Sequence, residues 1–213
     1  AQTIKIGIIN TYSGVNAAPG DQLDKAMKLY LKLNSSKLPS GVKVEPIFRD
    51  DGGPDPANAK RIAQELITRD KVQLLAGVIW TPNGAAIAPL TAEAKVPFVI
   101  GTASGVSIPR MSPYVARVSF TLWQSAYPLG QWASKKFKHV YTAVSDFAPG
   151  HEAEEAFQKG FKEGGGEVIG GVRIPLSNPD FVPYMQRVKD AKPNAVFVFV
   201  PGGDQSTQVR KAY

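Results

Sequence analysis

The sequence predicts an α/β protein with two lobes, each a parallel sheet flanked by helices. Three observations predict this class: nearly continuous apolar, β-rich runs alternate with helical stretches, each run stops at small hydroxyl or amide residues, and a helix begins soon afterwards. Apolar strands that alternate with helices are typical of a parallel sheet buried on both faces. The alternation restarts near Thr121, so we expect one lobe at 1–120 and a second at 121–213.

In the first lobe the strands are expected at 4–9, 42–48, 72–79, 96–100 and 114–118. The first helix carries an apolar stripe at a period of 3.6 residues and should bury it, the stripe being Leu23, Ala26, Met27, Tyr30 and Leu31. Asp55-Pro56 is an N-cap followed by a proline at the first helical position, and Thr81-Pro82 repeats that start signal. Pro89 should kink or shorten the helix that contains it.

The second lobe begins with a helix near Thr121. Strands are expected at 140–144, 168–172 and 195–200, with helices at 152–163 and over the stripe Phe181, Tyr184, Met185 and Val188. The sequence stops at Tyr213 in the middle of an apparent helix, so this lobe is expected to be incomplete.

Composition excludes several classes of protein. The 213 residues contain no cysteine, which removes disulfides and thiolate chemistry. The formal net charge of +7 is interpreted as surface lysines that keep the protein in solution, with attraction of anionic ligands or surfaces as the alternative. The lysines and arginines are dispersed, which argues against nucleic-acid binding. No apolar stretch approaches the length that spans a bilayer. The start at Ala1-Gln2-Thr3 is interpreted as the end left after removal of a signal peptide.

The motifs of common enzymes are missing. No G-x-G-x-x-G or phosphate loop is present, and in Gly101-Thr102-Ala103-Ser104-Gly105 the serine is one place away from a nucleophile elbow. The two histidines lack a metal-ligand spacing. Asp50-Asp51 is interpreted as a loop or capping pair with one carboxylate paired to Arg49. We therefore expect a protein that is not an enzyme and uses neither cofactor nor metal.

A binding site is expected where the strands end, because ligands of such sheets sit beyond the carboxyl ends of the strands. In the first lobe Ser13, Thr81 and Ser104 would donate hydrogen bonds, while Tyr12 and Trp80 would offer flat apolar faces. Residues that follow two strands of the second lobe would form the opposing wall: Phe147, Pro149, Pro201 and Gly202. Such a site suits a small anion with a ring or hydrocarbon body.

Several segments together resemble the solute-binding proteins of ABC uptake systems, of the leucine/isoleucine/valine-binding type. They are Ile4-Lys5-Ile6-Gly7, Ser13-Gly14, the turn from Asp50 to Pro56, Pro97-Phe98-Val99-Ile100, Ser112 to Arg117 and Pro193-Asn194-Ala195-Val196. The resemblance implies a periplasmic protein with two hinged Rossmann-like lobes that closes on a ligand and presents it to a membrane permease.

The resemblance also implies roles for single residues. The groups that hold a substrate carboxylate match Thr81, Ala103 and Ser104, with Thr102 in the same loop, and the aromatic wall of the second lobe falls at Phe147 to Pro149. Amino-acid binders pair a disulfide at positions that match Gly53 and Trp80, and their ammonium-binding acid aligns with Leu122. Neither feature is present, and Trp80-Thr81-Pro82-Asn83 is similar to relatives that take up aromatic acids. Family members are also longer.

The resulting hypothesis is a periplasmic binding protein for a benzoate-like or phenylpropenoate-like carboxylate. Three alternatives stay open at this point: binding of a branched-chain amino acid or amide, a ligand-sensing regulator or receptor domain on the same scaffold, and a small hydrolase or transferase.

Overall fold

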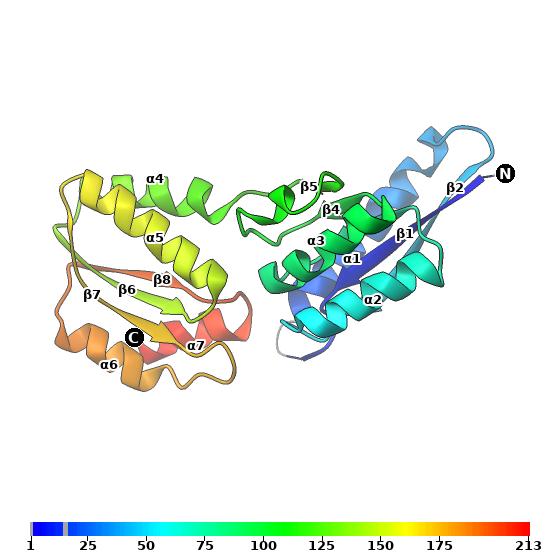
Figure 1. The fold of residues 1–213 in the computed structure, drawn as a ribbon. Coiled ribbons are helices and arrows are strands. Elements are labelled where there is room, and N and C mark those ends of the chain that lie inside the picture. The colour runs from blue at the N-terminus through cyan, green and yellow to red at the C-terminus, as the bar shows by residue number, and fades with distance from the viewer. Residues whose placement is uncertain (1, 15–16) are drawn as a thin grey trace. The chain divides into compact units, whose positions relative to one another are not determined.

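The chain folds into two compact α/β units, Ala1–Ser119 and Phe120–Tyr213, in a computed structural model that describes residues 2–14 and 17–213 (Figure 1). Each unit has its own sheet and its own hydrophobic core. Within the described residues no helix has both the length and the apolar character needed to cross a bilayer.

Unit 1 holds a five-stranded sheet in which every neighbouring pair is parallel and the strand order is β2-β1-β3-β4-β5. Its elements are β1 (Gln2–Asn10), α1 (Ala17–Asn34), η2 (Ser35–Lys37), β2 (Val42–Asp50), α2 (Pro56–Thr68), β3 (Leu74–Gly77), α3 (Thr81–Ala94), β4 (Phe98–Ile100), η3 (Ile108–Arg110) and β5 (Val115–Arg117). The chain passes from β1 outward to β2 and then returns to the other side of β1 as β3. The carboxyl ends of β1 and β3 therefore form a topological switch point.

Helices cover both faces of this sheet, with α2 and α3 on one face and α1 on the other (Figure 1). The main core lies under α2 and α3 and includes Ile9, Leu66, Leu75, Ile87 and Phe98, all of them completely buried. Burial on both faces explains why β3 and β4 in the interior of the sheet are apolar runs, whereas the edge strand β2 alternates polar and apolar residues.

For two helices of unit 1 the structure differs from the expectation, in the burial of α1 and in the length of α3. The stripe of α1 is only half-buried at Leu23, Met27 and Leu31, and Tyr30 on the same stripe is 67% exposed. The α3 helix runs to Ala94 through Pro89 instead of stopping there. Pro89 has no amide hydrogen to donate to the carbonyl of Ala85, and the helix continues without that one hydrogen bond.

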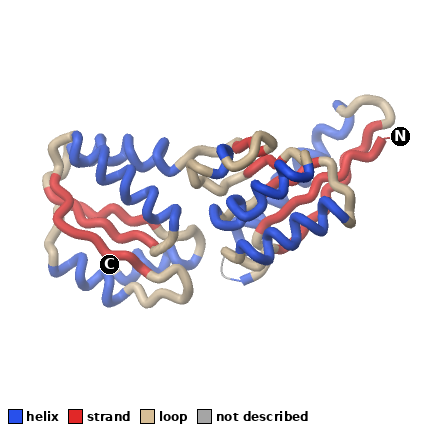
Figure 2. Tube along the Cα trace, viewed as in Figure 1, coloured by secondary structure: helices blue, strands red, loops and turns tan. Residues whose placement is uncertain are grey.

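Unit 2 holds a three-stranded parallel sheet in the order β7-β6-β8. Its elements are α4 (Leu122–Ser134), β6 (His139–Ser145), α5 (Ala148–Glu163), β7 (Glu167–Ile174), α6 (Val182–Asp190), β8 (Ala195–Phe199) and α7 (Asp204–Ala212). Helices α4 and α5 lie on one face of the sheet, and α6 and α7 lie on the other (Figure 2). Each face has a core, one around Phe157 and Phe197 and one around Ile174 and Met185.

Candidate functional site at the strand ends

The switch point of unit 1 brings together the segments after β1 and β3. Ile9 pairs with Gly77 in the parallel register, and the amide of Val78 donates to the carbonyl of Ile9 over 2.7 Å. Tyr12 and Ser13 follow β1 and Trp80 and Thr81 follow β3, so four of the predicted site residues start from adjacent strands. This proximity follows from the strand order.

Thr81 lies against the loop that follows β4. Its hydroxyl oxygen accepts a hydrogen bond from the amide of Gly105 over 3.2 Å. A Cβ at Gly105 would lie 2.4 Å from Cγ2 of Thr81, so only glycine permits this approach. Arg117 on β5 donates to the carbonyl of Gly105 over 2.6 Å, a support that the sequence analysis missed. The loops of Thr81 and Ser104 are therefore neighbours, which is the arrangement that a shared carboxylate site requires.

The donors around this contact differ in availability. Thr81 is 8% exposed, and its hydroxyl accepts the bond from Gly105 without donating to any residue that the structure describes, which leaves its proton available. Ser104 is half-buried, and no described residue hydrogen-bonds to its hydroxyl. The helix α3 begins at Thr81, and its N-terminus adds unpaired amides and a partial positive charge. Within the same loop Thr102 is exposed, and Ala103 is buried with its amide bound to the carbonyl of Val78.

Trp80 does not offer the open aromatic face that the sequence analysis expected. The side chain is 5% exposed, and Nε1 of the indole donates to the hydroxyl of Thr11 over 2.8 Å. Because Thr11 is itself buried at the end of β1, the ring is held inside the unit rather than presented at its surface.

A buried polar network around Asp51 connects the strand ends. Asp51 is fully buried, and its Oδ1 accepts from the Thr11 hydroxyl over 2.7 Å and from the amide of Gly53 over 3.1 Å. Its Oδ2 accepts from Nδ2 of Asn83 over 2.9 Å. This network was not predicted from the sequence, where its only signal was the paired aspartates after a strand.

Tyr12 and Ser13 also differ from open ligand contacts. Tyr12 is half-buried with its hydroxyl inside the unit, and burial raises the pKa of Tyr12 to about 12. Ser13 is exposed, and its hydroxyl is bound to Asp50. Partial burial opposes ionisation of Asp50, yet this hydroxyl and the amides of Tyr12, Gly52 and Ser13 lower the pKa of Asp50 below its ordinary value of 3.8.

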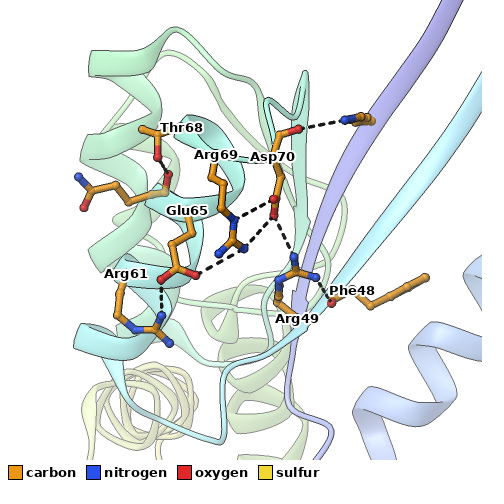
Figure 3. A network of polar contacts seen from close by, with 9 residues as sticks. Phe48, Arg49, Arg61, Glu65, Thr68, Arg69 and Asp70 are labelled. Carbon is orange, nitrogen blue, oxygen red and sulfur yellow. Dashed lines mark hydrogen bonds and ion pairs between the residues drawn. The ribbon is translucent and has the colours of Figure 1, made fainter.

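The expected pairing of Arg49 with one of the two aspartates is wrong. Arg49 binds Asp70 over 2.9 Å, in a surface network that also includes Arg69, Glu65 and Arg61 (Figure 3). Successive side chains on a strand point to opposite faces, so Arg49 and Asp50 on β2 are directed apart. Asp50 and Asp51 are free to organise the loops instead.

Unit 2 has its own switch point between β6 and β8. Phe147 directly precedes α5 and is half-buried, with its ring stacked on Phe199 at a centroid distance of 6.4 Å. Pro149 in the first turn of α5 is buried, whereas Pro201 is half-buried and Gly202 is exposed after β8. All four predicted wall residues thus lie at the carboxyl edge of the same sheet.

Comparisons with known proteins agree with this architecture. The model of the periplasmic binding protein family matches residues 3–212. A Leu/Ile/Val-binding protein homolog 6 from Brucella melitensis is 40% identical over all of this chain and 55% of its own length.

Two solved structures are also similar. A solute-binding protein of an ABC transporter from Rhodopseudomonas palustris BisB5, in complex with 3,4-dihydroxybenzoic acid, is 46% identical with a TM-score of 0.92 over 98% of this chain and 57% of its own. A solute-binding protein of an ABC transporter from R. palustris, in complex with 4-hydroxybenzoate, is 44% identical with a TM-score of 0.95. The match covers 100% of this chain and 58% of the other.

The chain therefore spans between half and three-fifths of the length of these relatives. The likeness nevertheless extends over both units, because the family match begins in β1 and ends in α7. The chain belongs to the periplasmic binding protein family.

Proposed function

We propose that this chain is the ligand-binding part of a periplasmic solute-binding protein of an ABC uptake transporter, and that its ligand is a benzoate-like carboxylate. The observation that carries the proposal is the contact between Thr81, at the N-terminus of α3, and Gly105, in the loop of Ser104. Two hydroxyls and a helix N-terminus at one place suit a carboxylate, since hydrogen bonds to charged groups contribute about 1.5–3 kcal/mol each. The aromatic acids bound by the two R. palustris relatives support a ring as the ligand body.

The proposal gives each predicted residue a role. Thr81 and Ser104, with Thr102 in the same loop, hold the carboxylate, while the buried Ala103 fixes that loop through the hydrogen bond from its amide to Val78 and Trp80 supports the loops as a buried ring. Tyr12 and Ser13 shape the neighbouring loop. Phe147, Pro149, Pro201 and Gly202 are proposed as apolar ligand contacts of unit 2, supported by their common position at the edge of its sheet. The protein would be exported with a signal peptide, would catalyse no reaction, and would deliver its ligand to a membrane permease.

A branched-chain amino acid is the second candidate ligand, and the name of the Brucella relative favours it. Leu122, where the amino-acid binders resembled by this sequence place an acid for the ammonium group, is an apolar residue packed in the core of unit 2. An ammonium group would therefore lack its partner, which favours the aromatic acid.

Isothermal titration calorimetry tests the proposal. We expect micromolar binding of 4-hydroxybenzoate, 3,4-dihydroxybenzoate or benzoate, and none of leucine or of 4-hydroxybenzamide, which lacks the carboxylate. Thr81→Val and Ser104→Ala should each weaken binding about tenfold or more, whereas Thr91→Val should leave it unchanged because Thr91 bonds to Ala88 and Ser112 elsewhere in unit 1. Tighter binding of leucine than of any aromatic acid would overturn the assignment.

A further inference from the structure

We infer that Asp51 is a positioning residue for the carboxylate site, acting through Thr11 on Trp80 and on the backbone turn that precedes Thr81. Asp51 is fully buried and cannot touch a ligand. The inference deepens the proposed function, because the site that Asp51 would position is the one proposed above.

The direction of each hydrogen bond in the network is fixed by chemistry. An indole nitrogen can only donate, so the hydroxyl of Thr11 must accept from Trp80 over 2.8 Å. A hydroxyl has a single proton, and that of Thr11 is then directed to Oδ1 of Asp51 over 2.7 Å. The two hydrogen bonds, from Trp80 to Thr11 and from Thr11 to Asp51, form a relay. Removing the acceptor at Asp51 interrupts its second bond, and removing the hydroxyl of Thr11 interrupts both.

Asp51 also connects segments that are distant in sequence. Its oxygens accept from Thr11 after β1, from the amide of Gly53 after β2 and from Asn83 in the first turn of α3. Nδ2 of Asn83 donates in addition to the carbonyl of Gly53 over 2.8 Å. One carboxyl group thus holds the ends of three neighbouring strands of the sheet, β2, β1 and β3, in a fixed relation.

The turn between β3 and α3 needs such support. Gly77 has φ of 102°, and Val78 has φ of 64°, which is an unfavourable conformation for a β-branched residue. Backbone strain of this kind persists only where the surroundings enforce it. Val78 is held by Ile9 through its amide and by Ala103 through its carbonyl, and the next side chain that enters the buried interior is Trp80.

Thr81 directly follows Trp80, so its hydroxyl keeps its place beside Gly105 only while the turn keeps its shape. Loss of the indole anchor would allow Val78 to relax and would move the Thr81 hydroxyl relative to the loop of Ser104. Two donors that no longer converge bind a carboxylate less tightly. A wholly buried carboxyl group would in this way control the affinity of a site that it does not contact.

The test follows the indole N–H of Trp80 by NMR in protein labelled with ¹⁵N-tryptophan, with the resonance assigned by its loss in Trp80→Phe. Thr11→Val removes the acceptor, Thr11→Ser restores it, and Asp51→Asn alters the other end of the relay. The matched control is Thr91→Val, since Thr91 is equally buried and hydrogen-bonded but outside the network. The affinity for 4-hydroxybenzoate is measured on the same samples.

In Thr11→Val we expect the Trp80 resonance to shift, its exchange with solvent to accelerate, and the affinity to fall about tenfold, as expected for an unsatisfied buried donor. Asp51→Asn should also lose affinity, because its amide hydrogens must face at least one of the present donors. Thr11→Ser should be close to the parent protein in both measurements, and Thr91→Val should change neither.

An unchanged Trp80 resonance in Thr11→Val overturns the relay. If Thr11→Val shifts the Trp80 resonance but binds 4-hydroxybenzoate as tightly as Thr91→Val does, the positioning role is overturned. If the parent protein binds no aromatic acid, the proposed function fails and the positioning role fails with it, while the resonance still reports whether Thr11 anchors the indole.

Discussion

Single residues at the strand ends of unit 1 divide into those that hold the loops and those that remain available to a ligand. Thr11, Asp51 and Asn83 hydrogen-bond to one another, to Trp80 and to the backbone of Gly53. Among residues 2–14 and 17–213, none accepts a hydrogen bond from the hydroxyl of Thr81, and none bonds to the hydroxyl of Ser104. The sequence could not separate the two groups, because a threonine after a strand has the same local signal in both. The separation comes from a contact between Trp80 and Thr11, which follow two different strands, β3 and β1.

The hydrogen bonds to Asp50 predict a dependence of stability on pH. Because the folded state lowers the pKa of Asp50, the ionised carboxylate stabilises the protein above the ordinary value of 3.8, and this stabilisation is lost as the pH falls through that value towards the folded pKa. The free energy of unfolding of the parent protein should exceed that of Asp50→Asn at neutral pH, and the difference should shrink below about pH 4. Urea unfolding of both proteins at a series of pH values from 7 to 2 measures this difference in the free energy of unfolding.

The control for Asp50 is Glu155→Gln. Glu155 is an exposed acid of α5, so the substitution removes the same charge without the hydrogen bonds of Asp50. A difference between the parent protein and Asp50→Asn that stays constant down to pH 2 would contradict the assignment.

Whole elements were more predictable than their surroundings. Asp55-Pro56 predicted the start of α2, and the carboxylate of Asp55 accepts from the amide of Asn58 over 3.0 Å as an N-cap. Local capping chemistry of this kind is visible in the sequence. The exposure of Tyr30 on α1 could not be predicted from the sequence, because the face that a helix buries depends on what packs against it. The close packing of α4 on α5 was also hidden, since its glycines carry no local pattern.

The contact between α4 and α5 predicts a stability defect in Gly160→Ala. A Cβ at Gly160 would lie 2.2 Å from the carbonyl oxygen of Tyr127, and one at Gly130 would lie 2.2 Å from that of Phe157. The helices would have to separate, so we expect a loss of about 1–3 kcal/mol despite the higher helix propensity of alanine. Thermal unfolding measures this loss. Glu155→Ala places alanine on the exposed face of the same helix and should change stability by less than about 0.5 kcal/mol; equal effects of the two would refute the packing argument.

Over the whole molecule, both units follow one plan, in which the candidate site residues lie at the carboxyl edge of a parallel sheet. The alternation of strands and helices predicted the sheets and their parallel strands. It could not predict the strand order, which brings Thr81 beside the segment after β1 and Phe147 beside the segment after β8. The order depends on contacts between distant segments, such as Ile9 with Gly77.

The free edge of β8 predicts that the 213-residue chain associates with a second copy of itself. No described strand pairs with the outer edge of β8, and hollows of about 360 and 180 Å³ lie beside it, both lined by Val196 and Val198. Several exposed side chains around this edge are apolar, with Val198 41%, Trp132 51% and Tyr213 62% exposed, beside the charged Arg210. An unpaired edge with apolar flanks favours pairing between chains.

Analytical ultracentrifugation over a range of concentrations measures this association. Val198→Lys places a charge at the edge of β8 and should shift the equilibrium to the monomer. Val182→Lys is the control. It adds the same charge at a residue of α6, away from that edge, that is 62% exposed. A parent protein that stays monomeric at every concentration, or an equal effect of the two lysines, would show that the edge of β8 does not mediate self-association.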